Sequence, residues 1–287
     1  MQEELRYFSY FATRNSVFLV GIVGVLFSLV VLVLGPIVAP YSPTATDPFH
    51  TLQAPSAAHL MGTDSIGMDI FSRVLWSPRT DLVIATLATG LSFLIGTSIG
   101  LFAGYFDGAG GVRGFLSQTI LRTLDIVQAF PVFIFALALV AALGASTANV
   151  VAAVAFANAP VFLRLTRPEV LSVRERRFIE ASRSIGNSET RAMIRHVLPN
   201  ALTPALSNVS ITIGWSILLT AGLSFVGAGV KVPTAEWGVM ISSGSENMIT
   251  GEWWPAFFPG VALSITVLSY SLLADGLRQY LDPTKRR

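Results

Sequence analysis

The sequence predicts an all-α integral membrane protein with six transmembrane helices. Only 13% of its 287 residues are charged and 52% are hydrophobic, whereas soluble domains carry about 25% charged residues. The charges gather between long uncharged segments, and these segments are long enough for the roughly 20 apolar residues that cross a bilayer. Lysine and arginine are also divided unevenly between alternate loops, which gives the chain a direction in the membrane.

The uncharged segments locate the spans. Between Asp125 and Arg164 lie 38 uncharged residues, enough for two helices separated by the small polar turn at 144–147. Pro131 and Pro160 fall inside these two helices and should kink them. The first apolar run is too long for the core of a cleaved signal peptide, so we read it as a retained helix. The spans are expected at about 16–39, 82–105, 124–143, 148–166, 204–226 and 256–279.

Orientation follows from the basic residues. If the N-terminus is inside, the exterior segments hold only Arg73, Arg79 and Lys231, which leaves 16 of the 19 lysines and arginines in the interior loops and tails. Such an excess predicts that both termini face the cytoplasm, N-in and C-in. The same distribution explains the pI near 9.1, so we expect no nucleic acid partner.

Two exterior segments are long. Prolines at the start of 40–80 favour an extended path, and the residues after them should form a short helix on the membrane surface. Asp64 or Ser65 would cap this helix, and Asp69 would pair with Arg73 one turn later. Three tryptophans of the second exterior segment fit an aromatic belt at the interface: Trp237, Trp253 and Trp254.

Three parts follow from this topology. Residues 1–80 hold the N-terminal tail, the first span and the surface helix, and residues 81–283 form the transmembrane core with an interior loop at about 168–200. Residues 284–287 form a basic tail. Within the second span, Gly96, Gly100 and Gly104 recur every four residues, a pattern that lets two membrane helices approach closely.

The sequence contains no recognisable motif for catalysis or for cofactor binding. The chain has no cysteine, and its two lysines are not followed by Ser or Thr, so neither belongs to a phosphate-binding loop. His50, His59 and His196 form no metal-ligand pair at helical spacing. We predict no catalytic, cofactor-binding or metal-binding residue, and any ATP hydrolysis must occur in a partner protein.

A self-sufficient secondary carrier is the alternative of another class. Such a carrier usually has ionisable residues at mid-membrane, and the six predicted spans have almost none at their centres. Asp125 and Asp275 lie near span ends, with Arg122 and Arg278 three residues away. Ion pairs at helix ends are therefore expected for both.

The interior loop from Arg174 to Asn200 is the longest charged segment. Up to Gly186, charged and apolar residues alternate in a pattern typical of an amphipathic helix. Asn187 or Ser188 can cap a second helix, which Pro199 should end before the fifth span. Such a helix pair would either lie on anionic lipid or dock a separate motor protein. An exposed corner at Gly186 favours docking.

This loop resembles the EAA motif of binding-protein-dependent ABC-transporter permeases, which reads Glu-Ala-Ala, three residues, Gly, nine residues, Ile, one residue, Leu-Pro. Ser182 stands at the second alanine and His196 at the isoleucine, and the ending of the loop is similar to the RHxLPN of the peptide branch. The resemblance assigns coupling to an ATPase to Glu180, Ala181, Ser182, Gly186, His196, Leu198, Pro199 and Asn200.

Other segments extend the resemblance over about residues 16–283. The exterior sequence MGTDSIGMDIFSR is similar to the GTDxxGRDxxSR signature of the C-type subunit of dipeptide and oligopeptide importers, with Met68 where that signature has arginine. The segments GLFAGYFDG, LRTLDIVQAFP and LSFVGAG, together with the ending ADGLRQYLDP, also resemble this subfamily.

The resemblance implies a type I ABC-importer permease fold in the inner membrane of a prokaryote. It implies as partners a homologous second permease, two ATPase subunits that hold ATP and Mg, and an extracytoplasmic substrate-binding protein. The chain itself would be no enzyme. Its cargo would be di- or oligopeptides, with nickel, glutathione or another small solute as alternatives.

Overall fold

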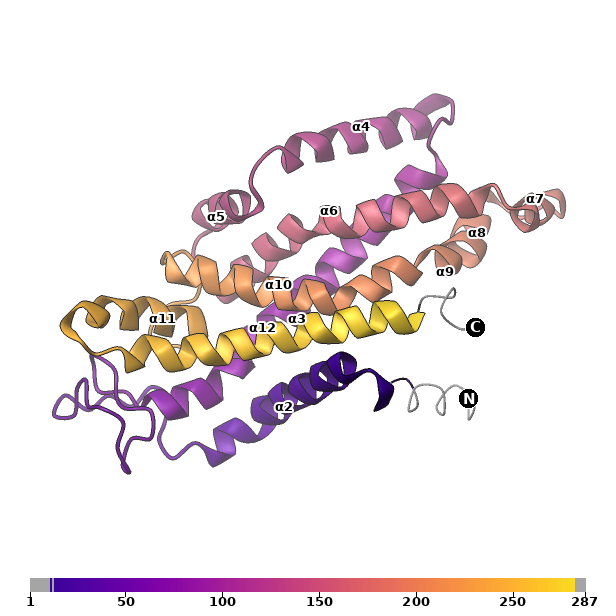
Figure 1. The fold of residues 1–287 in the computed structure, drawn as a ribbon. Coiled ribbons are helices and arrows are strands. Elements are labelled where there is room, and N and C mark those ends of the chain that lie inside the picture. The colour runs from indigo at the N-terminus through magenta and orange to yellow at the C-terminus, as the bar shows by residue number, and fades with distance from the viewer. Residues whose placement is uncertain (1–10, 12, 282–287) are drawn as a thin grey trace.

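Figure 1 shows the computed structural model of the chain, which describes residue 11 and residues 13–281. These residues form helices and no β-strand, so the all-α prediction is confirmed. The basic tail at 284–287 lies outside the described residues. The helices are α2 (Ser16–Val38), α3 (Ile70–Tyr105), α4 (Gly111–Gln128), α5 (Val132–Leu143), α6 (Thr147–Arg174), α7 (Arg177–Ser184), α8 (Glu189–Ala192), α9 (Leu198–Ala201), α10 (Thr203–Phe225), α11 (Trp237–Ser245) and α12 (Trp254–Leu281).

Within residues 13–281, five helices are long and apolar enough to cross a membrane: α2, α3, α6, α10 and α12. The sixth candidate is the pair α4 and α5, which is bent by 97°. The bend that Pro131 predicts in the third span, at 124–143, is present, but as a break between two helices rather than a kink within one. Pro131 is the N-cap of α5, and α4 ends before it because the residue that precedes a proline disfavours helical backbone. Pro160, in contrast, lies inside α6, and that helix continues through it.

The predicted surface helix and the second span are one helix. α3 runs without interruption for 36 residues, and Asp69, rather than Asp64 or Ser65, caps it by accepting a hydrogen bond from Ser72 N over 2.7 Å. At 1.5 Å per residue α3 is about 54 Å long, whereas the hydrocarbon core of a bilayer is about 30 Å thick. It therefore reaches beyond the bilayer core.

The expected ion pair between Asp69 and Arg73 is replaced by other contacts. His59 Nδ1 lies 2.9 Å from Asp69 Oδ1, and Arg73 donates to the carbonyl oxygens of Pro43 and Pro233 over 2.9 and 3.2 Å. Arg73 is only 2% exposed. It holds two distant loops against the start of α3, a role that spacing along one helix could not predict.

The ion pairs predicted near the ends of the third and sixth spans were also wrong. Neither is among the ion pairs of the described residues. Arg278 of α12 instead donates to Asn208 Oδ1 of α10 over 2.7 Å. Because this bond joins two helices, it contributes to packing of the bundle.

The glycine ladder of α3 packs against α6, as its spacing predicts. A Cβ added at Gly96, Gly100 or Gly104 would lie 2.3, 3.0 and 2.9 Å from carbonyl oxygens of α6. Those oxygens belong to Ala159, Leu163 and Arg167, which are spaced four residues apart, as the glycines are. The two backbones are therefore in contact along two helical turns.

The helices α2, α3, α6, α10 and α12 run along one bundle, and α4 lies at one side of it, where the Ser117 hydroxyl donates to Ala103 O of α3 over 2.9 Å (Figure 1). α2 begins and α12 ends at the same end, where Asn15 Nδ2 donates to Gln279 Oε1 over 3.1 Å. α7 also lies at this end, which we call the inner end, and α11 lies at the opposite, outer end (Figure 1). The interior loop and both ends of the described chain thus share one side.

Candidate functional site

The interior loop folds as two helical segments joined at a glycine. α6 ends at Arg174, a short turn follows, and α7 runs from Arg177 to Ser184, so the first helix begins three residues later than the start of the loop. Gly186 has φ +86°, a left-handed conformation that glycine adopts without strain. Ser188 then caps α8 by accepting from Arg191 N over 3.4 Å.

Pro199 does not end the second helical segment, contrary to expectation. α8 continues through a π-helical turn, Met193–Val197, into α9, and Pro199 is the second residue of α9. Proline lacks the N–H that would donate within a continuous helix, and the π-helical turn directly before α9 accommodates the missing bond. α9 ends at Ala201, and Leu202 separates it from α10.

One face of this segment is buried against the protein. Ile179, Val197 and Ala201 pack with residues at the inner ends of α3 and α6, including Leu101 and Val170. The opposite face is exposed. It carries Glu180, Ala181, Gly186, Pro199 and Asn200.

The remaining motif residues shape the corner. Ser182 is buried, and its hydroxyl accepts from Asn187 Nδ2 over 3.0 Å, which closes the turn around Gly186. His196 and Leu198 are half-buried. At the tip, Ile185 is 81% exposed. A Cβ at Gly186 would meet nothing within 4 Å, so the corner projects into open space.

A polar cluster that sequence reasoning missed fastens this segment to α3. The hydroxyl of Tyr105, the last residue of α3, donates to the carboxylate of Glu189. Arg183 donates to the same hydroxyl over 3.1 Å and pairs with Glu189 at 3.3 Å. The hydrogen bond to Tyr105 raises the pKa of Arg183, so its guanidinium stays charged. Tyr105 is 84 residues away from Glu189 in the chain, and no local pattern links them.

Arg174 makes a second connection at the same place. Its Nη1 donates to the carbonyl oxygens of Gly104, Tyr105 and Asp107 over 2.8, 3.1 and 2.9 Å. These carbonyls lie at the C-terminal end of α3, where backbone acceptors lack helical partners. Nearby, Arg167 of α6 pairs with the Asp107 side chain at 3.0 Å. The last residue of α6 therefore caps the C-terminal end of α3.

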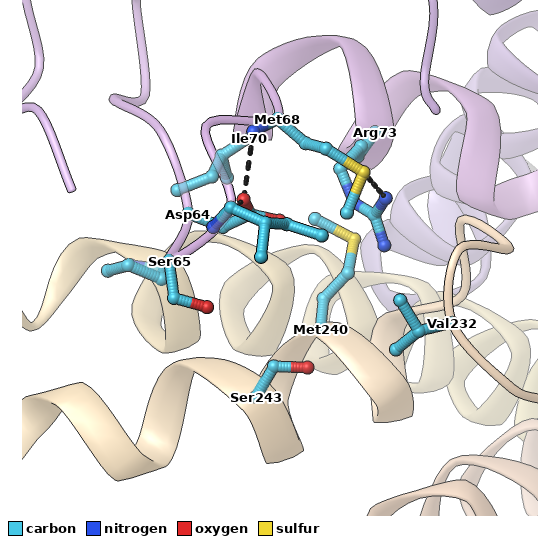
Figure 2. Close-up of a pocket in the computed structure, with 10 residues that line it drawn as sticks. Asp64, Ser65, Met68, Ile70, Arg73, Val232, Met240 and Ser243 are labelled. Carbon is cyan, nitrogen blue, oxygen red and sulfur yellow. Dashed lines mark hydrogen bonds between the residues drawn. The ribbon is translucent and has the colours of Figure 1, made fainter. Parts of the chain in front are cut away.

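A cavity of about 200 Å³ lies at the outer end, between the loop before α3 and α11. Figure 2 shows Asp64, Ser65, Met68 and Arg73 on one side and Met240 and Ser243 of α11 on the other. Asp64 accepts from Met68 N over 2.8 Å, and burial raises the pKa of Asp64. Met68 is 1% exposed, and its sulfur accepts from Arg73 over 2.7 Å. The residue that replaces the signature arginine thus packs inside the outer face.

Two carboxyl groups are buried together beside this cavity, between α3 and α11. Asp81 and Glu236 are both 0% exposed. Asp81 Oδ2 accepts from Trp237 N over 3.2 Å, and Glu236 Oε2 accepts from Val239 N over 2.7 Å as the cap of α11. Burial raises the pKa of Glu236. No pattern along the chain pairs them, because Asp81 lies at the boundary of the predicted second span and Glu236 in an exterior segment.

Trp237 was expected in an interfacial belt but lies in the core. It is 1% exposed and packs with Leu82, Ala85 and Ile217. Trp253, at 47% exposure, does fit an interfacial position. Among the described residues, no three His, Asp or Glu side chains gather closely enough to hold a metal ion.

Comparisons with known proteins agree with the motif. Residues 96–287 match the family described as "Binding-protein-dependent transport system inner membrane component". The dipeptide transport system permease protein DppC of Alkalihalophilus pseudofirmus is 36% identical over 270 residues, which cover 94% of this chain and 86% of the relative. The glutathione transport system permease protein GsiD of Pectobacterium atrosepticum is 39% identical, with 80% and 74% covered. The probable D,D-dipeptide transport system permease protein DdpC of Escherichia coli is 35% identical, with 89% and 83% covered.

Proposed function

Because this chain belongs to the inner membrane components of binding-protein-dependent transport systems, we propose that it is the permease subunit of an ATP-driven importer of di- or oligopeptides. It would form half of a translocation pathway across the inner membrane. Two of these relatives are named for dipeptides, which favours peptides as the class of cargo. Glutathione, for which the third relative is named, nickel or another small solute is the alternative.

The exposed corner of the interior loop is the observation that carries the mechanism. A surface with its reverse face packed on α3 and α6 and its front face free is suited to insertion into a partner. We assign it to docking on a separate ATPase subunit. Glu180, Ala181 and Gly186 would contact the partner, since they are exposed. Ser182, His196 and Leu198 would hold the shape of the corner, and Pro199 and Asn200 would border it.

The proposed mechanism divides the work between subunits. ATP and Mg would bind to the two ATPase subunits, and this chain would hydrolyse nothing. Closure of the ATPase pair would draw the docking corners of the two permeases together and open the pathway outward, where a substrate-binding protein delivers the peptide. The shared position of α7 and both described chain ends supports an N-in, C-in topology.

The second permease would pack against α4 and α5. Large apolar side chains of α4 are exposed, among them Val112, Phe115 and Ile126 at 74%, 70% and 66%. A cavity of about 390 Å³ opens between α4 and α6, lined in part by Gln128 and Arg164. A partner that covers this side would bury the apolar face and leave the polar lining towards the pathway.

The docking role is tested with Glu180→Lys and Gly186→Pro in the assembled, reconstituted complex. Both variants should reach the membrane, but peptide uptake should fall at least about ten-fold while ATP hydrolysis loses its dependence on the binding protein. Glu246→Lys, the same charge change on an exposed residue at the outer end, is the matched control. Normal uptake in both corner variants would refute docking. Mass spectrometry of the ligand retained by the co-purified binding protein would identify the cargo.

A further inference from the structure

We propose that α3 is the lever that carries motion from the docking corner to the outer cavity, and that Tyr105, Arg183 and Glu189 are the positioning residues that fasten its inner end. This inference rests on the proposed function, since it needs a partner that moves the corner. It goes beyond it by naming the helix that transmits the motion and the side chains that connect the two.

Both helical segments of the docking corner, α7 and α8, contact the inner end of α3. Arg183 lies on α7 and Glu189 on α8, and both contact the hydroxyl of Tyr105. The guanidinium of Arg183 also lies over the Tyr105 ring, 5.6 Å from its centroid. Because α7 and α8 both hold the Tyr105 side chain, they cannot shift together without moving α3 unless these contacts break.

α10 offers the obvious alternative route, because it follows α9 directly in the chain. The junction at Leu202 makes no side-chain capping hydrogen bond, and the segment before it contains the π-helical turn Met193–Val197. Irregular helical turns of this kind are common points of bending. α3, in contrast, is held by a charged cluster and by Arg174 on its terminal carbonyls.

Packing against α6 stiffens the middle of α3. The close backbone contacts at Gly96, Gly100 and Gly104 leave no space for the two helices to slide past each other. α6 ends at Arg174, so the same pair of helices is joined again at the corner. α3 and α6 should therefore move as one body.

The outer end of α3 is fastened to the walls of the cavity. Arg73 donates to Pro233 O on the loop that leads to α11. Further along α3, Asp81 accepts from the backbone N–H of Trp237, the first residue of α11. Figure 2 shows Arg73 and Met240 of α11 facing the same cavity. A displacement of α3 is therefore passed to α11 and the loop before it, which form the side of the cavity opposite Ser65.

The test measures the cavity while the corner is driven. The chain has no cysteine, so Ser65→Cys and Ser243→Cys introduce two unique sites for spin labels, one on each side of the cavity. The distance between the labels is measured in the reconstituted complex with its partners, with and without a non-hydrolysable ATP analogue. In the labelled protein without further changes, ATP should shift this distance.

Tyr105→Phe removes both hydroxyl contacts and keeps the ring, and Glu189→Gln removes the charge that Arg183 pairs with. Each should reduce the ATP-dependent distance shift at least two-fold and uptake about five-fold, in complexes that co-purify normally. Tyr270→Phe is the matched control, because it also removes a buried hydroxyl contact, with Ser28, far from the corner. It should leave the shift unchanged.

The outcomes separate the two hypotheses. If ATP shifts the distance in the unmodified background and equally in Tyr105→Phe and Glu189→Gln, the lever is refuted and docking stands. If ATP shifts nothing in that background while peptide uptake still depends on ATP, the lever is refuted and the proposed function stands. If uptake does not depend on ATP, the proposed function itself fails. A shift lost in both variants and kept in Tyr270→Phe supports the lever.

Discussion

Replacing Gly96 by alanine tests the close packing of α3 on α6. The new Cβ would lie 2.3 Å from the carbonyl oxygen of Ala159 and 2.7 Å from Phe162 Cβ, whereas ordinary contact begins at 3.4 Å. The two helices would have to separate by about 1.1 Å, the difference between 3.4 and 2.3 Å. The obstacle is backbone, so it cannot be relieved by a change of rotamer.

Gly90 provides the matched control on the same helix, since a Cβ there would meet nothing within 4 Å. Alanine in place of glycine inside a helix stabilises by about 0.5–1 kcal/mol at either position. The clash at Gly96 adds a cost at the upper end of the about 1–3 kcal/mol that overpacking takes. Gly96→Ala should therefore be less stable than Gly90→Ala by about 3 kcal/mol.

The assay is a denaturation titration with sodium dodecyl sulfate of the purified chain in bicelles, followed by circular dichroism. Both variants are compared with the unmodified protein under the same conditions. Equal unfolding free energies for Gly96→Ala and Gly90→Ala would contradict the contact between the backbones of α3 and α6, and with it the stiffness that the lever requires.

Two further predictions concern the outer end. Arg73→Ala should destabilise the chain by about 3 kcal/mol, because it leaves buried carbonyls such as Pro233 O without a donor and removes a packed side chain; a loss below about 1 kcal/mol in the same titration would contradict this role. Burial raises the pKa of Glu236 in the folded state, so its protonated form is favoured by folding. This contribution to stability is complete below the unfolded value of about 4.3 and is lost as the pH rises through the folded value. Glu236→Gln should flatten stability over that interval, and an unchanged pH slope would argue against it.

Gaps between charges locate the five long apolar helices of the described residues, because an unpaired charge is costly in lipid. They fail where a charge is buried in protein instead. Asp81 set the predicted start of the second span, yet it lies inside α3 with its carboxyl against α11. The gaps also fail for a helix with exposed charges: Arg113 and Arg122 predict a loop at 111–123, although both are exposed residues of α4.

The candidate site likewise has one part that local sequence patterns predict and another part that they do not. The helix pair around Gly186 follows from local rules of amphipathicity, capping and glycine conformation, and these are readable along the chain. The fastening by Tyr105 and Arg174 depends on side chains brought together from distant parts of the sequence. Nothing in one sequence marks such contacts, and the chain folds them into place through packing of the apolar residues around Ile179.

The exposure of Ile185 has a consequence for the life of the subunit before assembly. An apolar side chain that is 81% exposed at a projecting corner can associate with other apolar surfaces in water. Burying it in a partner would contribute about 2 kcal/mol, and until then it is a site for unwanted association. If the corner docks an ATPase subunit as proposed, cells that make this chain without that partner should degrade it faster.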